Sequence, residues 1–130
     1  MNNYVGKKIL LIDDDVLNMK LAVKKIEPYG CSITQGFSAA EMFELLKNNE
    51  YDLILLDNMM PVMEGIEAVQ ILRGRISKPE LFNGVYIKPV VVLTGDSKPA
   101  EEFLAAGFDE YLGKPLDSTM LEEVLKKFLG

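Results

Sequence analysis

The chain has 130 residues, 48% hydrophobic and 26% charged, which is the size and composition of one soluble globular domain with a proper core. It contains no histidine and has a net charge of −6, which excludes Ser–His–Asp and Cys–His nucleophile systems and ordinary zinc sites, and argues against general nucleic-acid binding. The lone cysteine, Cys31, excludes an internal disulfide, and because no apolar segment resembles a signal-peptide core or a membrane span, we expect a cytoplasmic protein.

The N-terminal half predicts an alternation of strands and helices. Continuous apolar runs at residues 9–12 and 53–56 are typical of strands that are buried on both faces. A shorter, more polar stretch at residues 32–35 predicts a strand at the edge of a sheet. Two segments between these strands repeat apolar residues at helical spacing. Their apolar faces are Val16, Met19, Val23 and Ile26 in the first segment, and Ala39, Met42, Phe43 and Leu46 in the second.

The C-terminal half continues this alternation with one interruption. The stretch 73–89 contains several glycines and prolines and predicts a long irregular connection. The apolar run at residues 90–93 predicts a third buried strand, and residues 110–112 predict a second edge strand. Three further helical faces are expected from Ile66, Val69 and Leu72, from Ala100, Phe103 and Leu104, and from Leu121, Val124, Leu125 and Phe128.

A strand followed by a helix, repeated five times, predicts an α/β fold. Because crossovers between parallel strands are right-handed, the expected architecture is a doubly wound parallel sheet with helices on both faces. We expect the whole chain, residues 1–130, to form a single domain. Sheets of this class bind ligands beyond the carboxyl ends of their strands, so the residues at those ends are the candidates for function.

Chemically distinctive residues stand at these strand ends. Asp13 and Asp14 follow the first strand, Asp57 the third, Thr94 the fourth and Lys114 the fifth. The carboxyl ends of parallel strands lie along one edge of the sheet, so these side chains are expected to converge. Carboxylates this close raise one another's pKa unless a cation neutralises them, and Mg²⁺ is the cation that prefers such oxygen ligands.

This set of residues suits phosphoryl transfer, which depends on positioning and charge neutralisation. An aspartate can act as the nucleophile and form an acyl phosphate, and Asp57 is the central candidate because it follows the middle strand. Lys114 offers a compact positive charge, and Thr94 offers a hydroxyl donor to the same phosphoryl oxygens.

Four motifs, "LLIDDD", "DLILLDNMMPVMEG", "VVVLTG" and "YLGKPL", occur in this order along the chain. With these motifs the sequence resembles a response-regulator receiver domain, the phosphoacceptor unit of two-component and phosphorelay signalling. The resemblance covers essentially the whole chain. It implies a flavodoxin-like fold with strand order 2-1-3-4-5 and Mg²⁺-dependent transfer of phosphate from a phosphohistidine donor to this chain.

The resemblance assigns roles to the acidic residues. Asp57, which follows "DLILL", matches the phosphorylated aspartate. Asp13 and Asp14 match the acidic pair at the metal site, Asp14 being the expected direct ligand. Asp57 and the backbone carbonyl of Met59 would complete the ligands that the protein gives to Mg²⁺.

The same resemblance assigns the phosphoryl-binding and switching residues. Thr94 and Lys114 match the residues that hold phosphoryl oxygens. Tyr111 matches the aromatic switch residue that moves together with Thr94. The bond between Lys114 and Pro115 matches a peptide bond that is usually cis in the family.

The sequence departs from the family pattern at two places. The connection between Asp57 and Thr94 is longer than is common, and the excess lies in "RISKPELFNGVYIK", residues 75–88. We expect it to leave the site intact and to reshape one flank for a partner. Met59 is apolar, whereas a polar residue at this position can orient the attacking water, so slow self-dephosphorylation is expected.

The same residues also fit simpler or different roles. Aspartates at 13–15 suit a helix N-terminus, but one suffices for capping, and we assign that role to Asp15. A haloacid-dehalogenase-type phosphohydrolase also uses an aspartate after a strand, but its motif requires a second aspartate where this chain has Met59. A binding module with a degenerate site is disfavoured because every expected site residue is present.

The expected partners follow from the receiver resemblance. Without histidine the chain cannot be the phosphohistidine donor, so the donor is a sensor histidine kinase or a histidine phosphotransfer protein. The output would go to a downstream protein or a second copy of the chain, through the face of the fourth helix, fifth strand and fifth helix. We expect no direct nucleic-acid or membrane binding, and no conventional enzyme activity beyond self-phosphorylation and slow self-dephosphorylation.

No output domain is expected within these 130 residues, which leaves a stand-alone receiver, a phosphorelay intermediate or one domain of a longer kinase or regulator.

Overall fold

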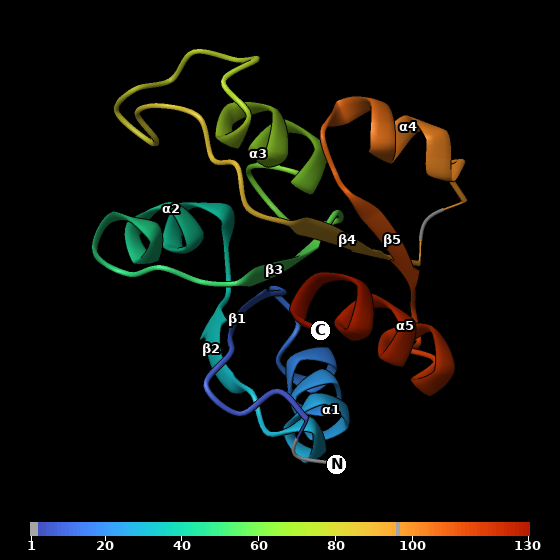
Figure 1. Cartoon of the computed structure of the whole chain (residues 1–130). Helices are drawn as coiled ribbons and strands as arrows, with labels where there is room; N and C mark the ends of the chain where they lie inside the picture. The colour runs from blue at the N-terminus through green and yellow to red at the C-terminus, as the bar shows by residue number, and fades with distance from the viewer. Residues whose placement is uncertain (1–2, 96) are drawn as a thin grey trace.

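A computed structural model describes residues 3–95 and 97–130 of the chain. Five parallel strands form one sheet in the order β2-β1-β3-β4-β5 (Figure 1). This is the predicted flavodoxin-like order, with the two more polar strands, β2 and β5, at the edges. The strands are β1 (Lys8–Ile12), β2 (Ser32–Gly36), β3 (Leu53–Asp57), β4 (Val90–Thr94) and β5 (Glu110–Gly113).

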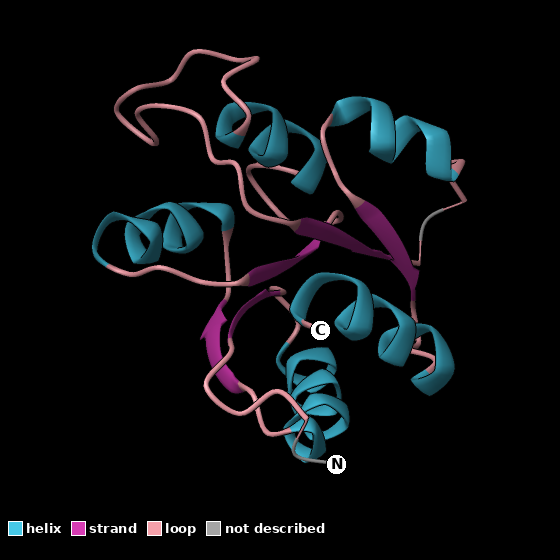
Figure 2. Cartoon of the chain, in the orientation of Figure 1, coloured by secondary structure: helices cyan, strands magenta, loops and turns pink. Residues whose placement is uncertain are grey.

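Helices connect the strands and cover both faces of the sheet (Figure 2). One face is covered by α2, α3 and α4, and the opposite face by α1 and α5. The two hydrophobic clusters that result take alternate side chains of the same strands, as the doubly wound fold requires. The helices are α1 (Val16–Ile26), a short 3₁₀ turn η1 (Glu27–Tyr29), α2 (Ala39–Asn48), α3 (Gly65–Leu72), α4 (Ala100–Ala106) and α5 (Ser118–Leu129).

The three apolar runs form the centre of the sheet, and this position places their ends side by side. All five residues of β3 and of β4 are buried. In the register of the sheet, Asp57 pairs with Leu93 and Thr94 pairs with Gly113. The sheet is therefore the frame that brings the candidate site residues to one edge. Within residues 3–95 and 97–130, no helix has the length and apolar character needed to cross a membrane.

The first helix buries most of the face that was expected, and Val16 is the exception. Met19 and Ile26 are buried as predicted, but Ala22 replaces Val16 in the core, and Val16 is 57% exposed. Asp15 is the N-cap, accepting a hydrogen bond from the Asn18 N–H at 2.9 Å. Val16 is the first residue after this cap and stays exposed to solvent.

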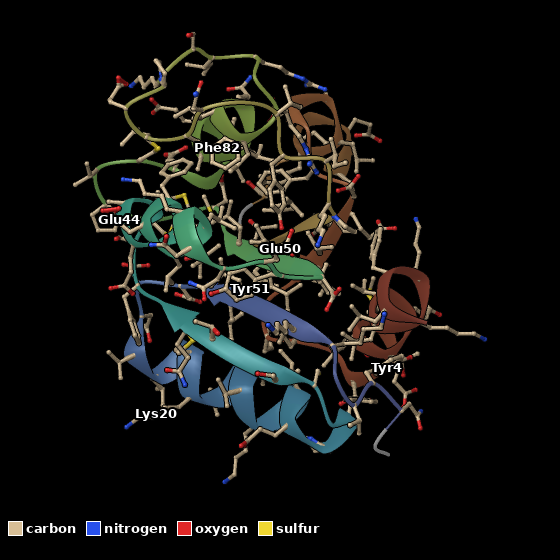
Figure 3. All side chains as sticks on the ribbon, turned by 60° about the vertical axis from the view of Figure 1, so that its left-hand side comes forward. Tyr4, Lys20, Glu44, Glu50, Tyr51 and Phe82 are labelled. Carbon is tan, nitrogen blue, oxygen red and sulfur yellow. The ribbon has the colours of Figure 1, made fainter. Side chains whose placement is uncertain are left out.

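The long connection between α3 and β4 extends from α3 to the side of α2 before it returns to β4 (Figure 1), and it is held mainly by Arg73. The Arg73 guanidinium donates hydrogen bonds to the carbonyl oxygens of Tyr86, Lys88 and Gly107 and to the carboxylate of Asp109, the last at 2.7 Å. From the middle of the connection the Phe82 side chain points inward and packs against the core, whereas Lys20 and Glu44 lie on outer helix faces (Figure 3).

Candidate functional site

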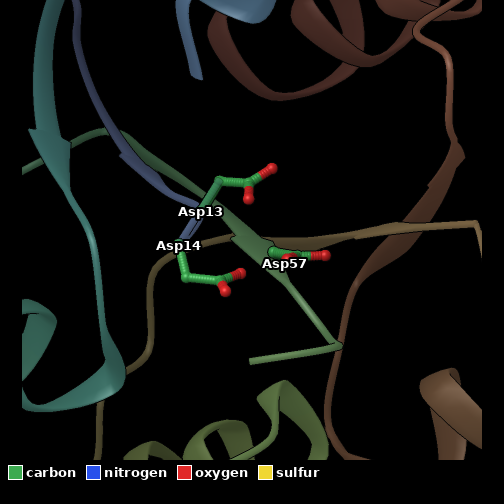
Figure 4. Close-up of side chains that lie close together, drawn as sticks. All are labelled: Asp13, Asp14 and Asp57. Atoms are coloured by element: carbon green, nitrogen blue, oxygen red, sulfur yellow. The ribbon is translucent and has the colours of Figure 1, made fainter. Parts of the chain in front are cut away.

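Three carboxylates converge at the carboxyl edge of the sheet (Figure 4). Asp13 and Asp14 follow β1, and Asp57 ends β3, the central strand. One carboxylate oxygen from each lies within 4.8 Å of the other two. Asp13 and Asp57 are buried and Asp14 is exposed. The predicted convergence of the acidic residues is confirmed.

Lys114 joins two of these carboxylates. It follows β5, and its Nζ lies 2.9 Å from Asp13 Oδ2 and 2.9 Å from Asp57 Oδ1. The Lys114 N–H also donates to the carbonyl oxygen of Thr94 at 2.9 Å, which fixes the lysine beside the end of β4. Its peptide bond to Pro115 is cis, as expected. One cation therefore faces three anions, and the site keeps a net negative charge.

The electrostatics of the site reflect this imbalance. Burial raises the pKa of Asp57 to about 6; the hydrogen bond from Lys114 opposes this rise, and the nearby charges of Asp13 and Asp14 add to it. Burial by itself would lower the pKa of Lys114, but hydrogen bonds to Asp57 and Asp13 outweigh it and raise that pKa. Asp57 is thus a carboxylate that costs free energy to ionise here, and a further cation would relieve this cost.

Thr94 and Tyr111 lie on the strands beside Asp57. Thr94 is buried at the end of β4. Tyr111 is half-buried on β5, with its ring 6.2 Å from that of Phe103 on α4. A Cβ placed on Gly113, the register partner of Thr94, would lie 3.8 Å from the Tyr111 hydroxyl oxygen. The tyrosine therefore spans from α4 to the edge of the sheet where Thr94 ends its strand.

A cavity of about 530 Å³ opens over the carboxylates. Besides the predicted residues it is lined by Asp15, Gly95 and Asn18. Asn18 was missed because sequence reasoning assigned the first turn of this helix only an apolar face and a cap. Asn18 follows Asp15 by three residues, about one helical turn, and this spacing could have predicted that its side chain lines the same cavity. Met59 also lines the cavity, with its side chain 58% exposed.

The loop from β3 to α3 contacts the backbone of Asp57 directly. A Cβ on Gly65 would lie 2.7 Å from the Asp57 carbonyl oxygen, so only glycine allows this approach. Asn58 is fully buried, and its Oδ1 accepts from the Ile66 N–H at 3.0 Å, which caps α3. Its Nδ2 has no hydrogen-bond partner among the described residues. The start of α3 is thus held by the residue next to Asp57.

Comparison with known proteins gives the same result over nearly the whole chain. Residues 9–126 match the family described as "Response regulator receiver domain". The aerobic respiration control sensor protein ArcB of Escherichia coli (strain K12) is 35% identical over 121 residues. That match covers 92% of this chain but only 15% of the length of ArcB.

Solved structures share the fold. The receiver domain of the Francisella response regulator 1452 superimposes with a TM-score of 0.81 at 29% identity, covering 95% of this chain and 97% of that one. The receiver domain of the Saccharomyces cerevisiae response regulator Ssk1, co-crystallised with the histidine phosphotransfer protein Ypd1, gives a TM-score of 0.80 over 97% of this chain and 90% of that one. At 21% identity this second likeness shows the fold alone.

Proposed function

The chain belongs to the response regulator receiver domain family, and on this premise we propose that it accepts a phosphoryl group on Asp57 and thereby switches a protein-interaction surface. One observation carries the proposal: Asp57 ends the central strand, buried, beside two further carboxylates and 2.9 Å from Lys114. Such a carboxylate is positioned to react rather than to serve as a solvated strand end.

In the proposed step a carboxylate oxygen of Asp57 attacks the phosphorus atom of a phosphohistidine on the donor protein. The new O–P bond gives an acyl phosphate, and the N–P bond to the imidazole breaks, leaving its electron pair on the donor nitrogen. Lys114 already bonds this carboxylate, so its charge offsets the negative charge that arrives. Thr94 ends the neighbouring strand, and we assign its hydroxyl to a phosphoryl oxygen.

The residues fit the Mg²⁺ that such a transfer requires. Asp13, Asp14 and Asp57 supply hard oxygen ligands within 4.8 Å of one another, and the pKa of Asp57 is raised first by burial and further by the charges of Asp13 and Asp14, which a bound cation would offset. We propose these three carboxylates and the backbone carbonyl of Met59 as the ligands given by the protein. When bound, Mg²⁺ supplies positive charge that offsets the carboxylates and the phosphoryl oxygens.

The proposed switch joins Thr94 to Tyr111. A phosphoryl group that draws the Thr94 hydroxyl inward vacates space beside Gly113, where the Tyr111 hydroxyl already lies. Tyr111 also packs against Phe103 of α4, so its movement would change the α4–β5–α5 face. This is a local charge event that biases a two-state element, and a downstream protein or a second copy of the chain would read it.

The proposed phosphoryl donor is a histidine kinase or a histidine phosphotransfer protein. This assignment is supported by the absence of histidine from the chain and by the name of ArcB as a sensor protein. We propose that residues 1–130 act as one receiver unit with no catalytic task beyond their own phosphorylation and slow dephosphorylation. The chain spans 15% of the length of ArcB, so the activities of the whole relative are not transferred to it.

Phosphate-affinity electrophoresis after incubation with acetyl phosphate and Mg²⁺ tests the proposal. The wild-type chain should give a retarded band, and Asp57→Ala should not. Asp15→Ala is the matched control, because Asp15 is an exposed aspartate at the same strand end that caps α1, and it should still shift. A shift that survives in Asp57→Ala, or a wild-type chain that never shifts, would sink the receiver function. Rapid release of inorganic phosphate from a phosphomonoester would instead favour the hydrolase.

A further inference from the structure

A second cavity, of about 470 Å³, lies away from the carboxylates. Its walls are the first turn of α2, the loop from β3 to α3, and Leu81 from the connection 73–89. The lining is almost wholly apolar. At its rim the side chain of Phe37 is 39% exposed and that of Val62 is fully exposed. We refer to it as the α2–α3 groove. Exposed apolar side chains around an apolar groove are a feature of binding sites rather than of ordinary surface.

The exposed valine is held in a costly conformation. Val62 has φ of 73°, in the region that β-branched residues rarely adopt, and the Met63 N–H bonds the Pro61 carbonyl oxygen at 2.8 Å to form a γ-turn. A fully exposed apolar side chain on a strained backbone contributes no packing free energy to the stability of the fold. Its position at the rim is explained if a partner covers it.

Each wall of the groove carries one acidic residue. Glu41 follows the lining residue Ala40, Glu64 follows Met63 and Glu80 precedes Leu81, and all three glutamates are exposed. No ion pair joins any of them within the described part of the chain. The nearby lysines are already engaged, Lys47 with Glu44 at 2.7 Å and Lys78 with Glu67 at 3.3 Å. The rim is therefore negatively charged and is complementary to a basic ligand.

The walls also decide the shape of the occupant. They are helix, turn and loop, and none of them is a strand. A bound peptide consequently finds no row of backbone groups to pair with and must be anchored by its side chains. An amphipathic helix is the segment that presents several apolar side chains on one face, with charged residues beside them.

We propose that the α2–α3 groove binds a basic amphipathic helix of a partner protein, with apolar side chains in the groove and lysine or arginine facing Glu41, Glu64 and Glu80. This surface is separate from the α4–β5–α5 face, so a partner could remain on the groove while that face changes. The wall containing Val62 belongs to the loop that starts at Asp57, so the bound helix would lie next to the phosphoacceptor loop.

The test uses a fluorescent synthetic helix of leucine and lysine with its leucines on one face. Two control peptides are a scrambled version of the same composition and a version with glutamate for lysine. Binding to the full chain, with Mg²⁺ and physiological salt present, is followed by anisotropy and mapped by amide chemical shifts. We expect the basic amphipathic peptide to bind at micromolar to low-millimolar concentration, with shifts centred on the groove, and both controls to bind much more weakly.

Variants separate the groove from general electrostatics. Val62→Ser removes an exposed anchor without touching the core, and we expect about tenfold weaker binding. A Glu41→Gln, Glu64→Gln, Glu80→Gln triple variant should weaken binding several-fold. The matched control is Ile87→Ser, an exposed apolar residue (87%) on the connection 73–89 outside the groove, which should bind as wild type. Equal binding of the scrambled or acidic peptide, shifts centred on Asp13 and Asp57, no effect of Val62→Ser, or no binding up to millimolar concentration would each overturn the proposal.

Discussion

Replacing the phosphoacceptor with its neutral isostere should stabilise the metal-free protein. Asp57→Asn keeps the shape of the side chain and removes a charge that burial opposes. The pKa of Asp57 rises from 3.8 to about 6 in the folded protein, and a rise of about two units corresponds to about 3 kcal/mol of unfolding free energy. Lys114 keeps its bond to Asp13 at 2.9 Å, so the substitution leaves no unpaired ammonium.

This stabilisation should depend on pH in a defined window. A folded-state pKa above the unfolded value means that the folded chain binds the proton more tightly between about pH 4 and about pH 6. The unfolding free energy of the wild type therefore falls as pH rises through this window, and the favourable contribution is lost above it. The difference between Asp57→Asn and wild type should be near zero at about pH 4 and approach about 3 kcal/mol at about pH 7.

Urea unfolding in the presence of a chelator, followed by circular dichroism because the chain has no tryptophan, measures both proteins across this range. Asp15→Asn is the control, because asparagine caps a helix as well as aspartate does. Asp15 also does not belong to the group of Asp13, Asp14 and Asp57. Adding Mg²⁺ should then stabilise the wild type more than the variant and close the gap. A variant that is less stable than wild type near neutral pH, or a difference that does not change with pH, would refute this view of the site.

Three further substitutions test other contacts. Gly65→Ala should cost about 1–3 kcal/mol of unfolding free energy, because its Cβ would lie 2.7 Å from the Asp57 carbonyl oxygen; Gly95→Ala, whose Cβ would make only an ordinary contact with Lys114 Cβ at 3.9 Å, should leave urea stability nearly unchanged. Arg73→Met should cost about 2–3 kcal/mol of unfolding free energy and speed amide exchange in residues 84–88, since it removes the bonds that hold the connection; unchanged exchange there would contradict this. Met59→Asn should shorten the lifetime of the acyl phosphate about five- to tenfold by orienting the attacking water, and an equal lifetime in the electrophoretic assay would count against it.

Much of the fold was predictable because it depends on local composition. The apolar runs at residues 9–12, 53–56 and 90–93 have no polar alternation, so only a sheet covered on both faces can bury them. Once the sheet is parallel, the residues after each strand share one edge. This geometric consequence, rather than any single motif, predicted the meeting of Asp57 and Lys114.

The rest depended on distances that a sequence does not contain. The sequence pattern allows either Val16 or Ala22 on the buried face of α1. In the folded chain α1 packs in one cluster with residues of β1 and α5, and this packing buries Ala22 and leaves Val16 exposed. Asn58 follows Asp57 and looks like a loop residue, yet its side chain turns inward to cap α3. Arg73 resembles an exposed helix-end cation in sequence, and only the folded structure places the carbonyl groups of Tyr86, Lys88 and Gly107 around its guanidinium.

The anchoring of the connection by Arg73 makes the exposed Asn83–Gly84 segment a suitable place for insertions in protein engineering. Arg73 bonds the chain on the return side at Tyr86 and Lys88, just before β4. Residues between Arg73 and Tyr86 can therefore change in number without shifting the register of β4 in the sheet. Asn83 and Gly84 are exposed, and a Cβ on Gly84 would meet nothing within 4 Å. Because loop-closure entropy rises only by about 0.6 kcal/mol for each doubling of length, an epitope or a fluorescent reporter domain inserted there should be carried without loss of the receiver fold.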